Sequence, residues 1–297
     1  MTVFQKIVRE IKRFIKKCAS FRFIGNGNKK KEIINYFKTL DKNNQDSEVL
    51  EVIRYFQNNP FSIFPYDFTK KYIADNIDVF TDKKENMMYI LHENKRMYFP
   101  KGWEKCRIQN YYNRLLIEQD IDSPHRYEND AVHVNNGDIV ADIGTAEGIF
   151  ALSNIEKAKK IYLFECDNEW INVLEKTFEP WKEKIVIVNK FISDHTKGDC
   201  ITLDDYFNEN EINFIKADIE GDETRLLQGA KQIFARVKKL QMVLCAYHKE
   251  KDAEELQKEL TAQNFRIEFS KRYMIFIYDS ELQKPYLRRG IIRASKI

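Results

Sequence analysis

The chain has 297 residues, of which 43% are hydrophobic, 13% aromatic and 32% charged, so it can bury the core of one large α/β domain and a smaller one. No stretch holds the roughly 18 to 20 consecutive apolar residues that cross a bilayer. The five cysteines are scattered and form no CxxC pair. This argues against a disulfide framework or a zinc site and favours a reducing, cytoplasmic compartment.

The net charge of +3 is unevenly distributed along the chain. Residues 1–31 contain ten Lys or Arg and one acid, a charge of +9 that leaves −6 for the rest. An acidic body binds nucleic acid poorly, so we expect no nucleic-acid partner. Within the basic arm, residues 3–18 have the pattern of an amphipathic helix with a cationic back. Such a helix either docks on the protein's own core or makes a peripheral contact with the inner face of a membrane.

The first part of the chain is predominantly helical in its pattern. Helices are predicted at 32–40 and 47–57, followed by a connector at 59–68 that is rich in aromatic residues and proline. Residues 87–100 predict two short strands around a His-Glu-Asn-Lys turn, and residues 108–119 predict a helix. We therefore divide the chain into a helical N-terminal region, residues 1–85, and a second domain, residues 86–297.

From Gly137 onward, strands alternate with helices. Strand patterns occur at 138–143, 160–165, 185–190, 212–217 and 240–246, and apolar helical faces lie between them. This alternation is typical of parallel βαβ units. At 265–280, "FRIEFSKRYMIFIYDS" predicts two strands too close together for a crossover, which therefore form an antiparallel hairpin. The predicted fold is α/β, with a mostly parallel sheet that contains one antiparallel strand.

A turn of small residues follows the first of these strands, in "DIVADIGTAEGIFAL" (138–152). Gly144, Ala146 and Gly148 alternate with larger residues, so backbone amides could approach a nucleotide at the carboxyl edge of the sheet. Alone, such a turn could equally be a structural corner. Glu165 ends the second strand, 21 residues after Gly144, where it could accept hydrogen bonds from both ribose hydroxyls.

The type of nucleotide follows from charge and from the glycine pattern. A dinucleotide fingerprint requires G-x-G-x-x-G/A, but here Ala146 replaces the middle glycine and Asp142 precedes the turn. An acid that points into the turn would repel a pyrophosphate. It suits S-adenosylmethionine, which carries an ammonium and a sulfonium. An NAD-dependent oxidoreductase is the alternative.

Four segments resemble the FkbM family of S-adenosylmethionine-dependent methyltransferases: "DIVADIGTAEG", "YLFECD", "ITLDDYF" (201–207) and "FIKADIEGDETRLLQGA" (214–230). The last is the most specific, because D-x-E-G-x-E followed by L-x-G-A is characteristic of that family. The resemblance runs from about Asp138 to Ala230 and extends to His248. It implies a Rossmann-like, seven-stranded methyltransferase sheet within residues 86–297.

The resemblance also implies roles for individual residues. Asp142, Gly144, Ala146 and Gly148 form the turn around the methionine part of the donor, Glu165 binds its ribose, and Ser193 and Asp194 contact the adenine. Asp218 would face the junction of donor and acceptor. One departure concerns the acceptor side: many relatives have a glutamate two or three residues before the histidine of the fifth strand, where this chain has Cys245 and Ala246.

Transfer of a methyl group requires alignment of the acceptor, and a hydroxyl acceptor also requires a proton acceptor. His248, just past the fifth strand, titrates near neutrality and is the predicted base, with Asp218 as the alternative. Asp218 and Glu220 could instead bind a divalent metal or cap a helix; the predicted site contains no metal. His125 and Arg126 either reach the acceptor or the donor carboxylate, or lie on a surface loop.

The sequence therefore predicts an O-methyltransferase that uses S-adenosylmethionine to modify a hydroxyl of a glycan or secondary metabolite. The family resemblance alone supports this acceptor class. Two alternatives remain at this stage: an NAD-dependent oxidoreductase, and a non-catalytic module that keeps the nucleotide fold to bind a partner.

Overall fold

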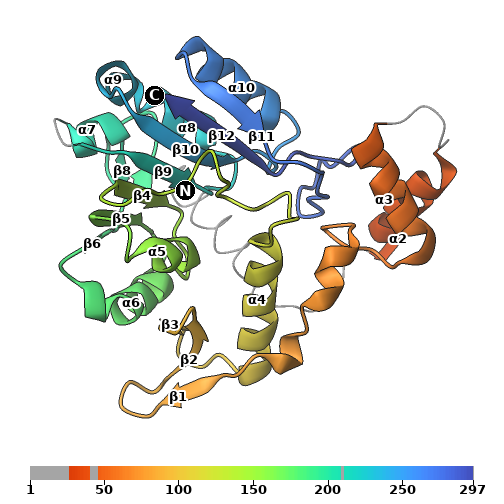
Figure 1. Ribbon diagram of the computed structural model, residues 1–297, viewed down its shortest axis with the longest axis horizontal. Coiled ribbons are helices and arrows are strands. Elements are labelled where there is room, and N and C mark those ends of the chain that lie inside the picture. Colours follow the sequence, from red (N-terminus) through yellow and green to blue (C-terminus); the bar gives the residue numbers. More distant parts are fainter. Residues whose placement is uncertain (1–26, 41–45, 209–210, 297) are drawn as a thin grey trace.

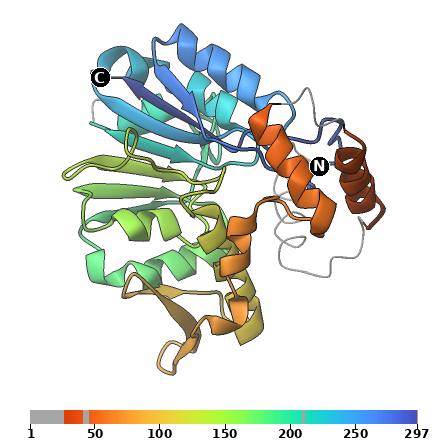
Figure 2. The ribbon, with the colours of Figure 1, turned by 45° about the vertical axis from the view of Figure 1, so that its right-hand side comes forward.

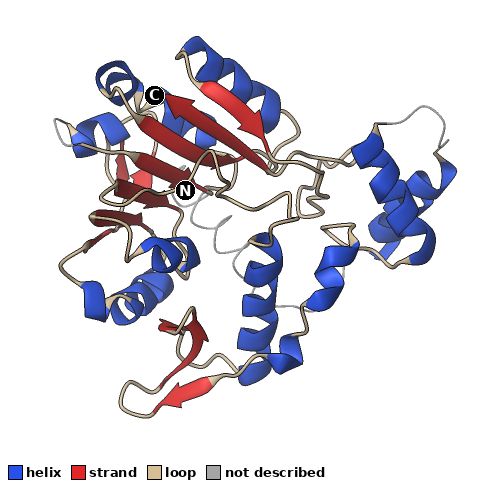
Figure 3. Ribbon diagram, viewed as in Figure 1, coloured by secondary structure: helices blue, strands red, loops and turns tan. Residues whose placement is uncertain are grey.

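The structure, a computed structural model, describes residues 27–40, 46–208 and 211–296, so the predicted basic helix at 3–18 lies outside the described residues. A seven-stranded sheet forms its centre (Figures 1 and 3), with the order β6-β5-β4-β9-β10-β12-β11. Its strands are β4 (Ile139–Ile143), β5 (Lys160–Phe164), β6 (Ile185–Val188), β9 (Phe214–Ala217), β10 (Leu240–Cys245), β11 (Arg266–Phe269) and β12 (Ile291–Lys296). Strands β6 to β10 pair in parallel, while β12 runs antiparallel to both its neighbours. The predicted fold class is confirmed.

The predicted C-terminal hairpin is correct in its first strand and wrong in its second. Strand β11 lies within the predicted 265–280 segment, but its antiparallel partner is β12 rather than the second half of that segment. Residues 270–290 form an insertion, closed by a bridge between Met274 and Arg288. The apolar residues of the insertion, such as Ile275, are buried against other loops and not within the sheet. A short apolar run does not distinguish these two environments.

Helices cover both faces of the sheet (Figure 2). One face carries α7 (Leu203–Phe207), α8 (Glu223–Gln228), α9 (Lys231–Arg236) and α10 (Asp252–Ala262), and the other carries α5 (Ile149–Asn154) and α6 (Asn168–Thr177), with α4 (Lys105–Glu118) beside them. Each face has its own core: Phe214 of β9 packs into one and Ile215 into the other. Because successive side chains of a strand point to opposite faces, a strand covered on both sides is apolar throughout.

The apolar helical segment before β10 is divided at Gly229 into the two short helices α8 and α9. A Cβ atom at Gly229 would lie only 2.2 Å from the carbonyl oxygen of Ser193, so the chain passes this peptide without a side chain. The remaining short elements of this half are β7 (Phe191–Ile192), β8 (Cys200–Ile201) and η3 (Glu179–Trp181).

A small antiparallel sheet packs against α5 and α6. It consists of β1 (Phe80–Asp82), β2 (Met87–His92) and β3 (Lys95–Tyr98), and the turn between β2 and β3 lies where it was predicted. Glu93 and Asn94 in this turn both have positive φ, of 48° and 65°, as a two-residue hairpin turn requires. The pairing of β1 with β2 crosses residue 85. The division of the chain into two parts at that residue stays a prediction.

The N-terminal helices α2 (Gly27–Thr39) and α3 (Ser47–Asn58) pack against each other beside the 270–290 insertion (Figure 1). Two ion pairs join α3 to it: Arg272 Nη2 lies 2.8 Å from Glu51 Oε1, and Arg289 Nη1 lies 2.6 Å from Glu48 Oε2. The short helices η1 (Asp67–Lys71) and η2 (Ala74–Asn76) then lead toward α4. Among the described helices, none has the length and apolar character needed to cross a membrane.

Candidate functional site

The carboxyl ends of β4, β5, β9 and β10 meet at one edge of the sheet. The chain passes from β4 to β5 on one side and returns to β9 on the other, so the order of the strands reverses between β4 and β9. Loops that leave such a switch point diverge and leave a crevice in which ligands bind. Gly144, Glu165, Asp218 and His248 each follow one of these four strands closely. The fold therefore brings together predicted residues that are far apart in the sequence.

Gly144 is the point at which the turn after β4 touches the end of β9. Its φ is +70°, and a Cβ atom there would lie 2.0 Å from the carbonyl oxygen of Asp218. Only glycine allows both the positive φ and this contact. Gly148 has a different task, because a Cβ there would lie 2.8 Å from Leu174 and 2.9 Å from Phe178. Its lack of a side chain lets α5 begin against α6; contact of Gly148 with the donor stays a prediction.

Glu165 is held rigidly by backbone amides. Its Oε2 accepts a hydrogen bond from Ala146 N at 2.9 Å, and its Oε1 accepts from Cys166 N at 2.7 Å and from Asp167 N at 2.8 Å. Burial raises the pKa of Glu165, and the three amide bonds act in the opposite direction. A carboxylate can accept about four hydrogen bonds, so it keeps capacity for ribose hydroxyls. Ala146, with φ +48°, thus links the turn after β4 to this acid.

The carboxylate of Asp142 is paired with a lysine and is not a free negative charge at the turn. Its carboxylate is fully buried, and Lys216, its partner in the β4–β9 register, places Nζ 3.0 Å from Asp142 Oδ1. Lys216 also donates a hydrogen bond to the carbonyl oxygen of Gly144 at 2.8 Å. The predicted attraction between Asp142 and a cationic donor is corrected here, because Lys216 neutralises the charge of this carboxylate. Contact between Asp142 and a donor stays a prediction.

Two other acids lie near this turn. Glu147 is only 4% exposed, and its Oε2 accepts a hydrogen bond from Tyr111 Oη at 2.7 Å. Glu118 ends α4; burial and the charges of Asp218 and Glu147 raise its pKa to about 8. Sequence reasoning missed Glu118 and Lys216. The available signal for Lys216 was a lysine inside the apolar strand of "FIKAD".

Ser193 and Asp194 lie after β7, next to α8. Ser193 is buried, and its hydroxyl donates to Asp194 Oδ1 at 3.1 Å. Asp194 Oδ1 also accepts from Arg225 Nη2 at 2.9 Å and lies 2.7 Å from His195 Nδ1. The hydrogen bond from Arg225, followed by that of His195, lowers the pKa of Asp194. The contact of both residues with adenine stays a prediction.

Asp218 and His248 form the centre of the acceptor side. His248 Nε2 lies 3.3 Å from Asp218 Oδ1 and 3.8 Å from Glu220 Oε2, and its Nδ1 lies 3.5 Å from Glu223 Oε1. The imidazole is 4% exposed, whereas 22% of the Asp218 side chain is exposed. Asp218 is therefore the member of this pair that a second substrate can reach.

The surroundings of His248 change its expected protonation. Burial alone would lower the pKa of His248, but the charge of Glu223 and the interactions with Asp218 and Glu220 outweigh it and raise this pKa well above 6.5. Burial alone would raise the pKa of Asp218, yet the hydrogen bond and charge of His248, with Lys216, lower it. The expectation that His248 titrates near neutrality is therefore corrected in direction: the surrounding carboxylates raise its pKa and favour its protonated form, beside an Asp218 whose own pKa is lowered.

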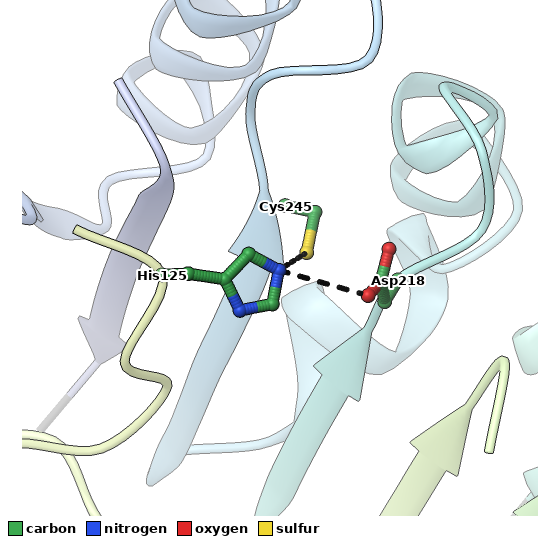
Figure 4. A group of neighbouring side chains, drawn as sticks. All are labelled: His125, Asp218 and Cys245. Atoms are coloured by element: carbon green, nitrogen blue, oxygen red, sulfur yellow. Dashed lines mark hydrogen bonds and ion pairs between the residues drawn. The ribbon is translucent and has the colours of Figure 1, made fainter. Parts of the chain in front are cut away.

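His125 belongs to the site and not to a surface loop. It is 3% exposed, and its Nε2 lies 3.1 Å from Tyr247 Oη, 3.9 Å from Asp218 Oδ2 and 3.9 Å from Cys245 Sγ (Figure 4). Burial lowers the pKa of His125 to about 4, so this imidazole is neutral. The sulfur that this imidazole contacts belongs to Cys245, one of the two residues at which the chain departs from the family pattern. The neighbouring Arg126 donates instead to the carbonyl oxygen of Glu128.

Tyr127 completes the shell around Asp218. Its hydroxyl donates a hydrogen bond to Asp218 Oδ2 at 3.1 Å. The ligand-type atoms of Asp218, Glu223 and His248 all lie within 4.8 Å of one another, as do those of His125, Asp218 and Cys245. Both sets mix nitrogen or sulfur with oxygen, unlike the all-oxygen sites that Mg²⁺ and Ca²⁺ prefer. A site without metal stays our prediction.

The comparisons with known proteins agree with the resemblance seen in the sequence. Residues 175–267 match the model of the Methyltransferase FkbM domain. This stretch contains the third and fourth of the segments that carried the resemblance, including the characteristic one around Asp218. The predicted family resemblance is confirmed over these residues. No curated protein matches the chain.

Among solved structures, the chain is similar to the methyltransferase FkbM from Methylobacillus flagellatus, with 14% identity and a TM-score of 0.46. That match covers 91% of this chain and spans 60% of the length of that one. TYW2 of M. jannaschii in complex with AdoMet matches with 11% identity, 74% and 92% coverage and a TM-score of 0.39. Aeropyrum pernix fibrillarin with bound S-adenosyl-L-methionine matches with 16% identity, 61% and 71% coverage and a TM-score of 0.35.

Proposed function

We propose, from the FkbM methyltransferase domain that residues 175–267 match, that this protein transfers a methyl group from S-adenosylmethionine to a hydroxyl of a glycan or secondary metabolite. The observation that supports it most is the contact of Gly144 with Asp218 at the switch point. This contact brings the turn that holds Glu165, an acid suited to a ribose, against Asp218, whose ionised carboxylate an acceptor can reach.

The residues of the crevice fit the chemical groups of this donor. Glu165 would accept hydrogen bonds from the ribose hydroxyls, and Ser193 and Asp194 would border the adenine. Glu147 would attract the ammonium, a part first given to Asp142. S-adenosylmethionine itself supplies a methyl group on a sulfonium. A pyrophosphate would meet these acids unfavourably, which argues against NAD.

Asp218 would hold the acceptor. Its ionised carboxylate is the exposed member of the cluster, so it can accept a hydrogen bond from a hydroxyl and orient the oxygen for in-line attack. The hydroxyl proton passes to this carboxylate as the oxygen is methylated. Because a carboxylate with a lowered pKa is a weak base, its main contribution is alignment. His248, whose Nε2 lies 3.3 Å from Asp218 Oδ1, keeps Asp218 ionised. We retain Asp218 and His248 as the catalytic pair, with His248 as the cationic partner and not as the initial base.

The N-terminal arm gives a proposal about location. Its ten basic residues and apolar face would suit an anionic membrane, so the enzyme would work in the cytoplasm at the inner membrane face. Sedimentation with vesicles containing phosphatidylserine tests this, with neutral vesicles as the control. A protein lacking residues 1–26 should no longer sediment, and unchanged sedimentation would remove the proposal.

The function itself is tested with S-adenosylmethionine carrying a labelled methyl group. The protein is incubated with panels of glycans and secondary metabolites, and mass spectrometry identifies the methylated atom. We expect the label on a hydroxyl oxygen and a rate at least tenfold lower for Asp218→Asn. Label found only on nitrogen or carbon would contradict the proposed acceptor class.

A further inference from the structure

The 270–290 insertion lies directly against the end of β10. The ring of Phe276 packs edge to face on His248, with centroids 5.3 Å apart and an angle of 85°, and also contacts Tyr247 at 5.0 Å. Ala246 N donates to the carbonyl oxygen of Gly290 at 2.9 Å. The insertion therefore contacts three consecutive residues, 246 to 248, that end at the proposed catalytic histidine.

Arg288 makes the most specific of these contacts. It is 6% exposed, and its Nη1 donates to the carbonyl oxygens of Tyr247 and His248, both at 2.7 Å. Its Nη2 forms an ion pair with Asp279, also within the insertion. A planar guanidinium can make these three contacts at once, whereas the single nitrogen of a lysine cannot reproduce this geometry.

The insertion is itself fixed from outside the sheet. Arg272 and Arg289 pair with Glu51 and Glu48 of α3, as described above, and Ile275 N donates to the carbonyl oxygen of Ile63 at 2.9 Å. Tyr66 Oη also accepts a hydrogen bond from Tyr273 N at 2.8 Å. A network of hydrogen bonds and ion pairs therefore runs from the N-terminal helices through the insertion to Arg288.

We propose that Arg288 is a positioning residue, which rests on the proposed function: it fixes the backbone at 247–248 so that the His248 imidazole stays between Asp218 and Glu223. Within the described residues, the ring nitrogens of His248 meet carboxylate oxygens at 3.3 to 3.8 Å, which is at or beyond the long end of the hydrogen-bond range. Its orientation must therefore come from its backbone and from Phe276. Arg288 supplies the backbone anchor, although it lies outside the segments that define the family.

The position of His248 can be read from its titration. The charged or titratable groups around it are Asp218 and Glu220 after β9, Glu223 of α8, Asp252 of α10, and His125. If the backbone anchor is lost, the imidazole moves away from the three glutamate and aspartate carboxylates that stabilise its charge. Its pKa then falls toward 6.5.

The test is Arg288→Lys, which keeps the charge, with Arg289→Lys as the matched control. Arg289 is the adjacent arginine, and it donates hydrogen bonds to Glu48, Tyr273 and the carbonyl oxygens of Ser270 and Arg272. The imidazole resonances of the full-length protein are followed by NMR against pH, and His248 is assigned by comparison with His248→Gln. Calorimetry with S-adenosylhomocysteine measures the donor site in the same proteins.

We expect the His248 pKa to fall by about one unit or more in Arg288→Lys and to stay unchanged in Arg289→Lys, while the donor affinity changes less than twofold in both. An unchanged His248 titration in Arg288→Lys would overturn the proposal. If that variant does not fold, Asp279→Asn replaces it, with a smaller shift in the same direction expected and no shift overturning the proposal. Absence of donor binding by the unmodified protein would instead refute the proposed function.

Discussion

The contact between Gly144 and Asp218 predicts the effect of one added methyl group. In Gly144→Ala, the new Cβ would lie 2.0 Å from the carbonyl oxygen of Asp218, and the φ of +70° is unfavourable for alanine. The positive φ costs about 1–2 kcal/mol. Relief of the overlap, which requires a shift of more than an ångström between β4 and β9, costs about 1–3 kcal/mol more. We expect a total loss of about 2–5 kcal/mol in the free energy of unfolding.

Gly137→Ala is the matched control, because Gly137 has a φ of +86° and no atom within 4 Å of an added Cβ. It should show only the cost of the backbone conformation, about 1–2 kcal/mol. Urea denaturation gives the two stabilities, and calorimetry gives the affinity for S-adenosylhomocysteine. Gly144→Ala should lose at least tenfold in affinity and Gly137→Ala none. Equal stability losses and equal affinities in the two variants would refute the reasoning.

Three further predictions concern the acids of the site. Glu165→Gln should lower the affinity for S-adenosylhomocysteine about tenfold or more, measured by calorimetry, because its amide nitrogen would face backbone N–H groups; an unchanged affinity would exclude Glu165 as the ribose acid. Glu118 has a raised pKa, so its ionisation costs stability as the pH rises from about 4.5 to 8. Urea denaturation should therefore find Glu118→Gln about 1–3 kcal/mol more stable than the unmodified protein at pH 8.5 and equal at pH 4.5, while equality at both would contradict the burial argument. Asp218→Asn should lower the pKa of His248 in an NMR titration by removing its closest counter-charge, and a constant pKa would show that the pair is not coupled.

The strand-and-helix alternation after Gly137 determined most of the sheet in advance. Strands covered on both faces are apolar throughout, and their order along the chain fixes a parallel topology with few alternatives. The one wrong strand, in the second half of 265–280, is apolar for a different reason: it belongs to an insertion buried against loops. Periodicity alone could not show that the partner of β11 is β12, at the chain end, and not this apolar run.

The sequence allowed prediction of the site residues that follow strand ends. It did not allow prediction of the contacts that side chains make between different strands and helices. Gly144, Glu165 and Asp218 follow three strand ends, so the fold alone brings them together. Lys216 lies in the middle of a strand, and its pairing with Asp142 depends on the register between β4 and β9. The protonation of His248 likewise depends on Glu223, which α8 carries into the site. Such cross-element contacts have no local signature in the sequence.

The most direct test of the account is calorimetric titration of the protein with S-adenosylhomocysteine and, separately, with NAD. We expect binding of S-adenosylhomocysteine with a dissociation constant in the micromolar range or below, about −8 kcal/mol or better, and no measurable binding of NAD. The same titration with Glu165→Gln should be weaker. Tight binding of NAD, or binding of S-adenosylhomocysteine that is unaffected by both Glu165→Gln and Gly144→Ala, would contradict the account.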